Sequence, residues 1–144
     1  MIRLLDVNVL VSLIDPDHVH HEPAHRWFAQ EENQDWATCP LTENGLVRVV
    51  SGVKYPQRIG VSEAVTRLPN MIFASGRHAF WTESISLLDT SLFRVPLLTS
   101  GLQITDAYLL ALAVHNRGML ATFDRRISPE SVVGGEAALY LIPT

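Results

Sequence analysis

The sequence has one cysteine, one lysine and no apolar run of membrane-spanning length. Cys39 by itself cannot form an internal disulfide, which indicates a reducing compartment. The apolar opening is interrupted by Asp6 and Asn8 and lacks a small-residue cleavage pattern, so it does not fit a secretory signal peptide. No stretch approaches the roughly 20 apolar residues that cross a bilayer. These absences predict a cytoplasmic protein without a membrane segment.

A large basic field is also lacking, since 15 acids and 11 bases give a net charge of −4. Such a chain cannot hold nucleic acid by counterion release alone. Ten of the eleven bases are arginine, which suits forked contacts to phosphate. Four arginines are candidate RNA contacts, although each fits plain surface equally well: Arg48, Arg58, Arg125 and Arg126.

The length of 144 residues suits a single domain, residues 1–144, with a sizeable core. Hydrophobic residues make up 47% of the chain, a high share for a protein in water. We therefore expect apolar surface that a partner or a second copy covers.

One stretch near the end of the chain, QITDAYLLALAVHNRGMLATFD, predicts a buried helix followed by a short buried strand. Asp106 opens a run that is apolar on almost every side, and Thr105 is its expected N-cap. Gly118 follows the last apolar residue and is the expected left-handed end of the helix. Residues 119–122 then fit a strand that leads to Asp124.

Strands and helices alternate through the rest of the chain. Buried strands are expected at 2–6, 35–39 and 139–142, a turn or helix at 7–14, and helices at 24–32, 42–50 and 61–68. Pro69 is expected to stop the last of these helices. Residues 70–100 are the least regular, with 78–81 and 85–88 fitting either short strands or irregular chain. The alternation predicts an α/β domain with a mostly parallel central sheet.

Four carboxylates stand where that sheet would bring them to one edge. Asp6 and Asp124 follow strands, whereas Glu43 and Asp106 lie near helix starts. Two unit charges about 4 Å apart repel by about 4 kcal/mol at an effective dielectric near 20, so such a cluster needs protons or a cation. Oxygen-only ligands predict Mg²⁺ or Mn²⁺, which lowers the pKa of a bound water and neutralises a phosphodiester.

Four segments carry a recognisable order: DVNVL from Asp6, Thr42-Glu43, TDAYLLALA from Thr105, and ATFD up to Asp124. Together they resemble the signature of PIN-domain ribonucleases, and among these the VapC toxins of bacterial type II toxin–antitoxin pairs. The resemblance implies a PIN-like α/β/α sandwich and an endoribonuclease that requires Mg²⁺ or Mn²⁺ and uses metal-activated water. It also implies inhibition by a cognate antitoxin protein and a homodimer.

The same resemblance implies roles for individual residues. Asp6 and Asp106 match the chief metal ligands, and Asp124 matches a ligand that holds the metal directly or through water. Glu43 would act on the metal or on the attacking water. Two further positions match supporting polar groups that orient the carboxylates: Asn8 and Thr122.

Several alternatives stay open at this point. A phosphatase of the haloacid-dehalogenase type requires a second acid where Asn8 stands, and a receiver domain requires a late lysine, whereas Lys54 is the only one. A metal-binding nucleic-acid or protein interaction module without catalysis, and a related deoxyribonuclease, both keep the acidic set. A zinc site at His21 and His25 lacks further ligands for a closed tetrahedral set. Aromatic residues that fit either base stacking or the core are Trp27, Trp36, Phe80 and Trp81.

Overall fold

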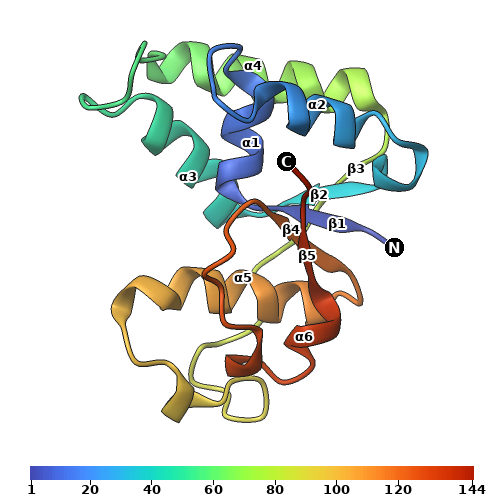
Figure 1. The fold of residues 1–144 in the computed structure, drawn as a ribbon, viewed down its shortest axis with the longest axis vertical. Helices are drawn as coiled ribbons and strands as arrows, with labels where there is room; N and C mark the ends of the chain where they lie inside the picture. The colour runs from blue at the N-terminus through green and yellow to red at the C-terminus, as the bar shows by residue number, and fades with distance from the viewer.

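Five short strands form one sheet in the order β3-β2-β1-β4-β5, and the computed structural model describes residues 1–144 (Figure 1). Every neighbouring pair is parallel, so the sheet is wholly rather than mostly parallel. Parallel sheets are buried on both faces, which explains why the strand sequences are apolar without alternation. The strands are β1 (Arg3–Leu5), β2 (Trp36–Thr38), β3 (His78–Phe80), β4 (Met119–Thr122) and β5 (Leu139–Leu141).

Helices cover both faces of the sheet, which makes an α/β/α sandwich (Figure 1). One face carries α1 (Val7–Ile14), α2 (His21–Phe28), α3 (Pro40–Val50) and α4 (Val61–Ser75), and the other carries α5 (Ile104–His115) and α6 (Gly135–Ala138). The two resulting cores contain 16 and 15 buried residues, so burial is shared almost equally. Four 3₁₀ turns complete the fold: Glu31–Asn33, Val95–Leu97, Gly101–Gln103 and Pro129–Ser131. None of the helices combines the length and the apolar character that crossing a bilayer requires.

The paired histidines of α2 bind backbone rather than zinc. His21 Nδ1 lies 2.7 Å from the carbonyl oxygen of Ser12, and His25 Nε2 lies 2.8 Å from that of Leu13. Both carbonyls belong to the last turn of α1, where a helix leaves its carbonyl groups without partners. The two imidazoles therefore hold α2 against the end of α1.

Helix α4 does not stop at Pro69, as the sequence predicts, but continues to its end at Ser75. Proline costs an internal helix one hydrogen bond, and Pro69 itself is exposed. Ala64, Leu68 and Ile72 follow one another at a spacing of four and face the core on both sides of the proline. Burial of this continuous stripe offsets the lost hydrogen bond, because tertiary packing outweighs local preference.

The start of α5 also differs from the expectation. Ser100 forms a capping box with Gln103, and the 3₁₀ turn that it opens runs directly into α5. Gln103 is thus the residue before the helix, and Thr105 already lies inside it. Asp106 keeps its expected place in the first turn.

The end of α5 is closed by Arg117, which has φ +56°, and Gly118 does not take the left-handed conformation. Glycine is required at position 118 for space. A β-carbon there would lie 2.4 Å from the carbonyl oxygen of Ile2 and 2.7 Å from the ring of Trp81. This close approach lets α5 turn directly into β4 beside the central strand.

Candidate active site

The parallel sheet brings the ends of three neighbouring strands, β2, β1 and β4, to one edge. Asp6 follows β1, Asp124 lies two residues beyond β4, and Glu43 is in the first turn of α3, which begins just after β2. Helix α5 precedes β4 and runs back along the sheet, so Asp106 in its first turn reaches the same edge. This is the edge at which open α/β sheets bind ligands.

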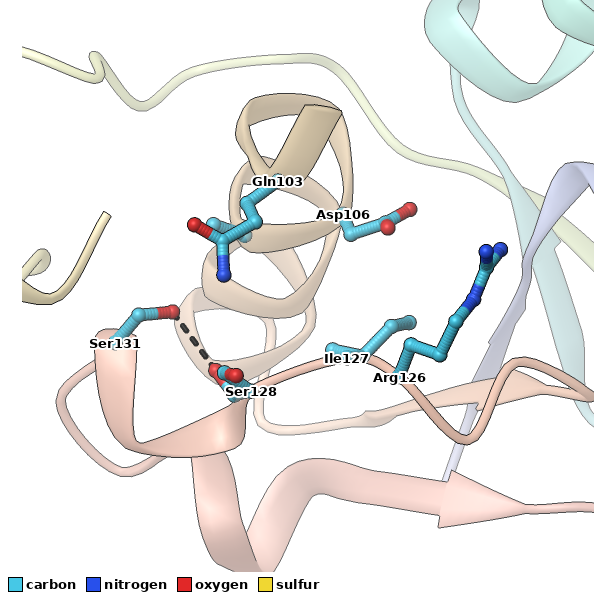
Figure 2. A pocket seen from close by; sticks show the side chains of 7 residues that line it. Gln103, Asp106, Arg126, Ile127, Ser128 and Ser131 are labelled. Atoms are coloured by element: carbon cyan, nitrogen blue, oxygen red, sulfur yellow. Dashed lines mark hydrogen bonds between the residues drawn. The ribbon is translucent and has the colours of Figure 1, made fainter. Parts of the chain in front are cut away.

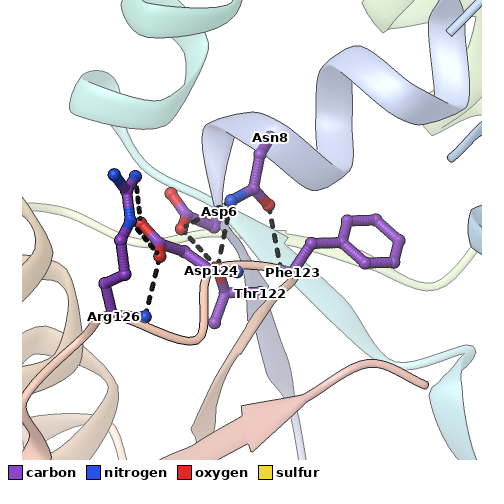
Figure 3. A network of polar contacts seen from close by, with 6 residues as sticks. All are labelled: Asp6, Asn8, Thr122, Phe123, Asp124 and Arg126. Carbon is purple, nitrogen blue, oxygen red and sulfur yellow. Dashed lines mark hydrogen bonds and ion pairs between the residues drawn. The ribbon is translucent and has the colours of Figure 1, made fainter. Parts of the chain in front are cut away.

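Asp6 is buried at the N-terminus of α1 and is held by two short hydrogen bonds and a longer one from Asn8 Nδ2 at 3.5 Å (Figure 3). Its Oδ1 accepts from the backbone N–H of Val7 at 2.7 Å, and its Oδ2 accepts from the hydroxyl of Thr122 at 2.7 Å. Burial raises the pKa of Asp6, the two hydrogen bonds lower it, and the charge of Asp124 raises it further. The net result is a pKa above the ordinary value for aspartate.

Asn8 and Thr122 join the segment after β1 to the segment after β4 (Figure 3). Asn8 Nδ2 donates to the Thr122 hydroxyl at 3.1 Å, and Asn8 Oδ1 accepts from the backbone N–H of Phe123 at 3.2 Å. The Thr122 hydroxyl also accepts from the backbone N–H of Asp124 at 3.0 Å. These contacts fix the backbone on which Asp6 and Asp124 stand.

Asp124 is paired with Arg126 through both carboxylate oxygens (Figure 3). Its Oδ1 accepts from the Nε of Arg126 at 3.0 Å and from its backbone N–H at 2.9 Å, and its Oδ2 accepts from Nη2 at 3.2 Å. These bonds lower the pKa of Asp124. The Arg126 side chain is 91% exposed, so water competes with Asp124 for the hydrogen bonds of its guanidinium.

Asp106 is half-buried and lies at a small pocket between α5 and the segment after β4 (Figure 2). Its pKa is raised to about 6, chiefly by burial and further by the charges of Asp6 and Asp124, with Arg126 acting in the opposite direction. Three aspartates from three separate segments therefore interact electrostatically. The remaining polar side chains of the pocket are Gln103, Ser128 and Ser131.

Glu43 stands apart from these three aspartates, although it lies at the same edge. It does not contribute to the raised pKa of Asp6 or Asp106. Its Oε2 accepts from the hydroxyl of Thr38 at 2.6 Å, and Thr38 in turn lies 2.7 Å from Nε2 of His78. Because the hydroxyl proton of Thr38 goes to the carboxylate, His78 must donate to Thr38.

The four arginines predicted as phosphate contacts divide into two pairs. Arg125 and Arg126 line a surface pocket together with Asp124. Arg58 instead donates its Nε to a backbone carbonyl 2.6 Å away in its own loop, and Arg48 is exposed in the last turn of α3. Only the first pair lies beside the acidic edge.

Of the two alternatives left open for the tryptophans, base stacking and the core, the structure shows the core. Their exposed fractions are 3%, 0% and 8% for Trp27, Trp36 and Trp81. A different aromatic pair, His20 stacked on Phe123, lines the pocket beside Asp124. Phe123 could have been singled out from the sequence because it lies between the motif residues Thr122 and Asp124. No sequence motif points to His20, which lies far from Phe123 in the chain.

The aspartate cluster offers only oxygen donors and carries an excess of negative charge, which suits a hard divalent cation. As the side chains stand, no three acidic, imidazole or thiol groups are arranged to hold one ion. Both oxygens of Asp124 are occupied by Arg126. The donor set thus fits Mg²⁺ or Mn²⁺, and the ion pair with Arg126 competes with a cation for Asp124.

Comparison with known families gives a match to the PIN domain over residues 3–129. Ribonuclease VapC44 of Mycobacterium tuberculosis is 44% identical over 134 residues, which cover 93% of this chain and 94% of the relative. Ribonuclease VapC38 of the same organism is 43% identical over 122 residues, 84% of each chain. The matched range 3–129 contains all four motif segments.

Two solved structures share the fold. The M. tuberculosis toxin VapC20, described as cleaving the sarcin-ricin loop, superposes with a TM-score of 0.63 at 15% identity, covering 91% of this chain and 96% of VapC20. FitAB bound to a DNA fragment superposes with a TM-score of 0.64 at 19% identity, covering 98% of this chain and 94% of the matched one. At these identities the likeness concerns the fold, and it confirms the predicted PIN-like α/β/α architecture. The chain therefore belongs to the PIN domain family, among its VapC-like members.

Proposed function

We propose that the protein is a Mg²⁺- or Mn²⁺-dependent endoribonuclease that acts as the toxin of a type II toxin–antitoxin pair. The observation that carries this proposal is the electrostatic coupling of Asp6, Asp106 and Asp124 at the carboxyl edge of the sheet. Two relatives named as VapC ribonucleases, each matched over 84% or more of both chains, support RNA as the substrate.

The three aspartates are the residues that would hold the cation. Thr122 and Val7 keep Asp6 in place, and the first turn of α5 presents Asp106. Asp124 would release Arg126, whose guanidinium then becomes available to a phosphate. When bound, Mg²⁺ or Mn²⁺ supplies positive charge beside the phosphodiester and lowers the pKa of water for attack.

Glu43 is proposed to act on the metal or on the attacking water. Its carboxylate is oriented by Thr38, and Thr38 is oriented by His78, so the chain of hydrogen bonds limits how far Glu43 can swing. Without the bond from Thr38, the Glu43 carboxylate would rotate freely and lose this orientation. The short 2.6 Å bond from Thr38 is the contact that supports a fixed role for Glu43.

A cognate antitoxin and a second copy of the chain are the proposed protein partners in the cytoplasm. Apolar side chains on the outer surface of α3, α4 and the loop between them support a covered interface. The exposed residues there are Val49, Val53, Val61, Val65 and Phe73. A search of the adjacent reading frames for a small protein, followed by co-purification, tests the antitoxin, and light scattering of the isolated chain tests the homodimer.

The direct test of the activity incubates the purified protein with RNA and with single-stranded DNA, in Mg²⁺ and in EDTA. We expect RNA cleavage in Mg²⁺ that EDTA abolishes. Asp6→Asn and Asp106→Asn should lose cleavage, whereas Asp89→Asn, a matched change in an exposed loop, should keep it.

Each alternative predicts a different result in the same assay. Cleavage of DNA but not RNA would assign the protein as a deoxyribonuclease. RNA binding without cleavage in either metal would indicate an interaction module. Full cleavage by Asp6→Asn or Asp106→Asn would remove the aspartates from the mechanism.

A further inference from the structure

A surface pocket beside Asp124 has an aromatic side and a basic side. Phe123 and Arg126 both line it, and Figure 3 shows their side chains pointing in opposite directions from the segment that carries Asp124. The loop between α1 and α2 lies on the aromatic side and lines the same pocket. The wall residues that contribute to the argument are His18, Val19, His20, Phe123, Arg125 and Arg126.

The aromatic side is built from a stacked pair of rings. The ring centroids of His20 and Phe123 lie 4.7 Å apart, and their planes differ by 18°. Phe123 packs against the core under α1–α4, and its backbone N–H is bound by Asn8. The backbone N–H of His20 donates to Nδ1 of His18 at 3.0 Å. Both rings are thus held in position from the side of the protein.

The two rings cover each other's inner faces, so this partly exposed pair offers an outer ring face to a third ring in the open pocket. Nucleobases stack on such surfaces in single-stranded RNA complexes, and every base has a face that can do so. Arg125 and Arg126 are exposed on the other side of Asp124 and suit the phosphates of the same strand. The pocket thus offers an aromatic contact for a base on one side of Asp124 and basic contacts for phosphates on the other.

We propose that the His20–Phe123 pair is the stacking platform for a nucleobase of single-stranded RNA adjacent to the scissile phosphate. Arg125 and Arg126 contact the phosphates on the opposite side. This assignment rests on the proposed ribonuclease function and adds to it the surface that binds the substrate strand. Stacking on a platform of this kind is tolerant of base identity, so the pair contributes affinity more than sequence choice.

The test compares two fluorescent oligomers of about 12 nucleotides, one of RNA and one of abasic ribose-phosphate with the same charge. Binding is measured by anisotropy in Mg²⁺ on the Asp106→Asn protein, so that the RNA survives. We expect the parent to prefer the base-bearing oligomer by about tenfold. Phe123→Ala and His20→Ala should each remove most of that preference while leaving affinity for the abasic strand unchanged.

Leu88→Ala is the control, because Leu88 is 87% exposed and lies outside both the pocket and the proposed partner interface. It should keep the preference of the parent. Phe123→Trp and His20→Tyr retain a ring and should restore binding, which separates stacking from damage to the fold. Circular dichroism identifies any variant that fails to fold, and His20→Ala then decides the matter because its side chain is not part of the core.

An unchanged preference in folded His20→Ala or Phe123→Ala protein would overturn the platform. A parent protein that leaves RNA intact in Mg²⁺ would instead overturn the proposed function. If Asp106→Asn still cleaves RNA, Asp106 is removed from the mechanism and the binding comparison is made in EDTA. The two failures are therefore separate observations.

Discussion

Replacing Asp106 by asparagine should stabilise the metal-free protein near neutral pH. The carboxylate has a pKa of about 6 because it is half-buried and faces the charges of Asp6 and Asp124. Ionising it in the folded state therefore costs more than ionising it in the unfolded chain. An amide of the same shape keeps the packing and removes that cost.

The magnitude follows from the shift in pKa. A rise from 3.8 to about 6 corresponds to at most about 3 kcal/mol, since each pKa unit is about 1.4 kcal/mol. Solvent screens a half-exposed carboxylate, which reduces this figure. Asp106 also lies in the first turn of α5, where a negative charge gains about 0.3–1 kcal/mol from the helix dipole. We expect a net stabilisation of about 1 kcal/mol.

The sign of the pH dependence follows from proton binding. The folded-state pKa exceeds the unfolded value, so the folded protein binds more protons between pH 3.8 and about 6. The stability associated with the protonated form is present below that window and is lost as the pH rises through it. The advantage of Asp106→Asn should therefore be small at about pH 4.5 and complete at about pH 7.5.

Urea unfolding followed by tryptophan fluorescence, with EDTA present, measures this difference at both pH values. Asp89→Asn serves as the control because its carboxylate is exposed and its pKa is lowered by hydrogen bonds to Ser91. Millimolar Mg²⁺ should stabilise the parent and have less effect on Asp106→Asn. A variant no more stable than the parent at about pH 7.5, or equally stabilised at both pH values, would refute the reasoning.

Three further substitutions test other parts of the site and the fold. Thr122→Val removes the hydroxyl that donates to buried Asp6 and should cost about 1–3 kcal/mol near neutral pH in urea unfolding, whereas Thr122→Ser should cost less. Gly118→Ala would place a β-carbon 2.4 Å from a backbone carbonyl oxygen, so we expect a loss of at least about 1–3 kcal/mol; a thermal midpoint equal to the parent's would contradict this. Arg126→Ala should change the free energy of unfolding by less than about 1 kcal/mol yet raise the pKa of Asp124, which carbon NMR of the carboxyl group measures directly.

The alternating elements and the positions of the acids could be predicted from the sequence. Apolar runs of strand length, and the helix that opens at Asp106, depend on residues close together in the chain. The placement of Asp6, Asp106 and Asp124 at one edge then follows, because strands connected through helices form a parallel sheet whose carboxyl ends share that edge. This level of the structure matches the expectation closely.

Local signals failed where packing outweighed them. Pro69 predicts the end of a helix, but the apolar stripe on both sides of it continues into the core. Gly118 predicts a left-handed helix end, yet Arg117 takes that conformation, and the glycine is needed because the space beside Ile2 admits no side chain at 118. In both cases the deciding contact comes from another segment of the chain.

The sequence by itself determined the fold class and which carboxylates stand at the edge of the sheet, because periodicity and caps act over a few residues. Only the tertiary structure decided what those carboxylates face. In that structure Asp124 forms an ion pair with Arg126, and Glu43 accepts a hydrogen bond from Thr38. The ring of His20 stacks on that of Phe123. Such pairings depend on side-chain direction and on contacts between distant segments, neither of which a linear pattern contains.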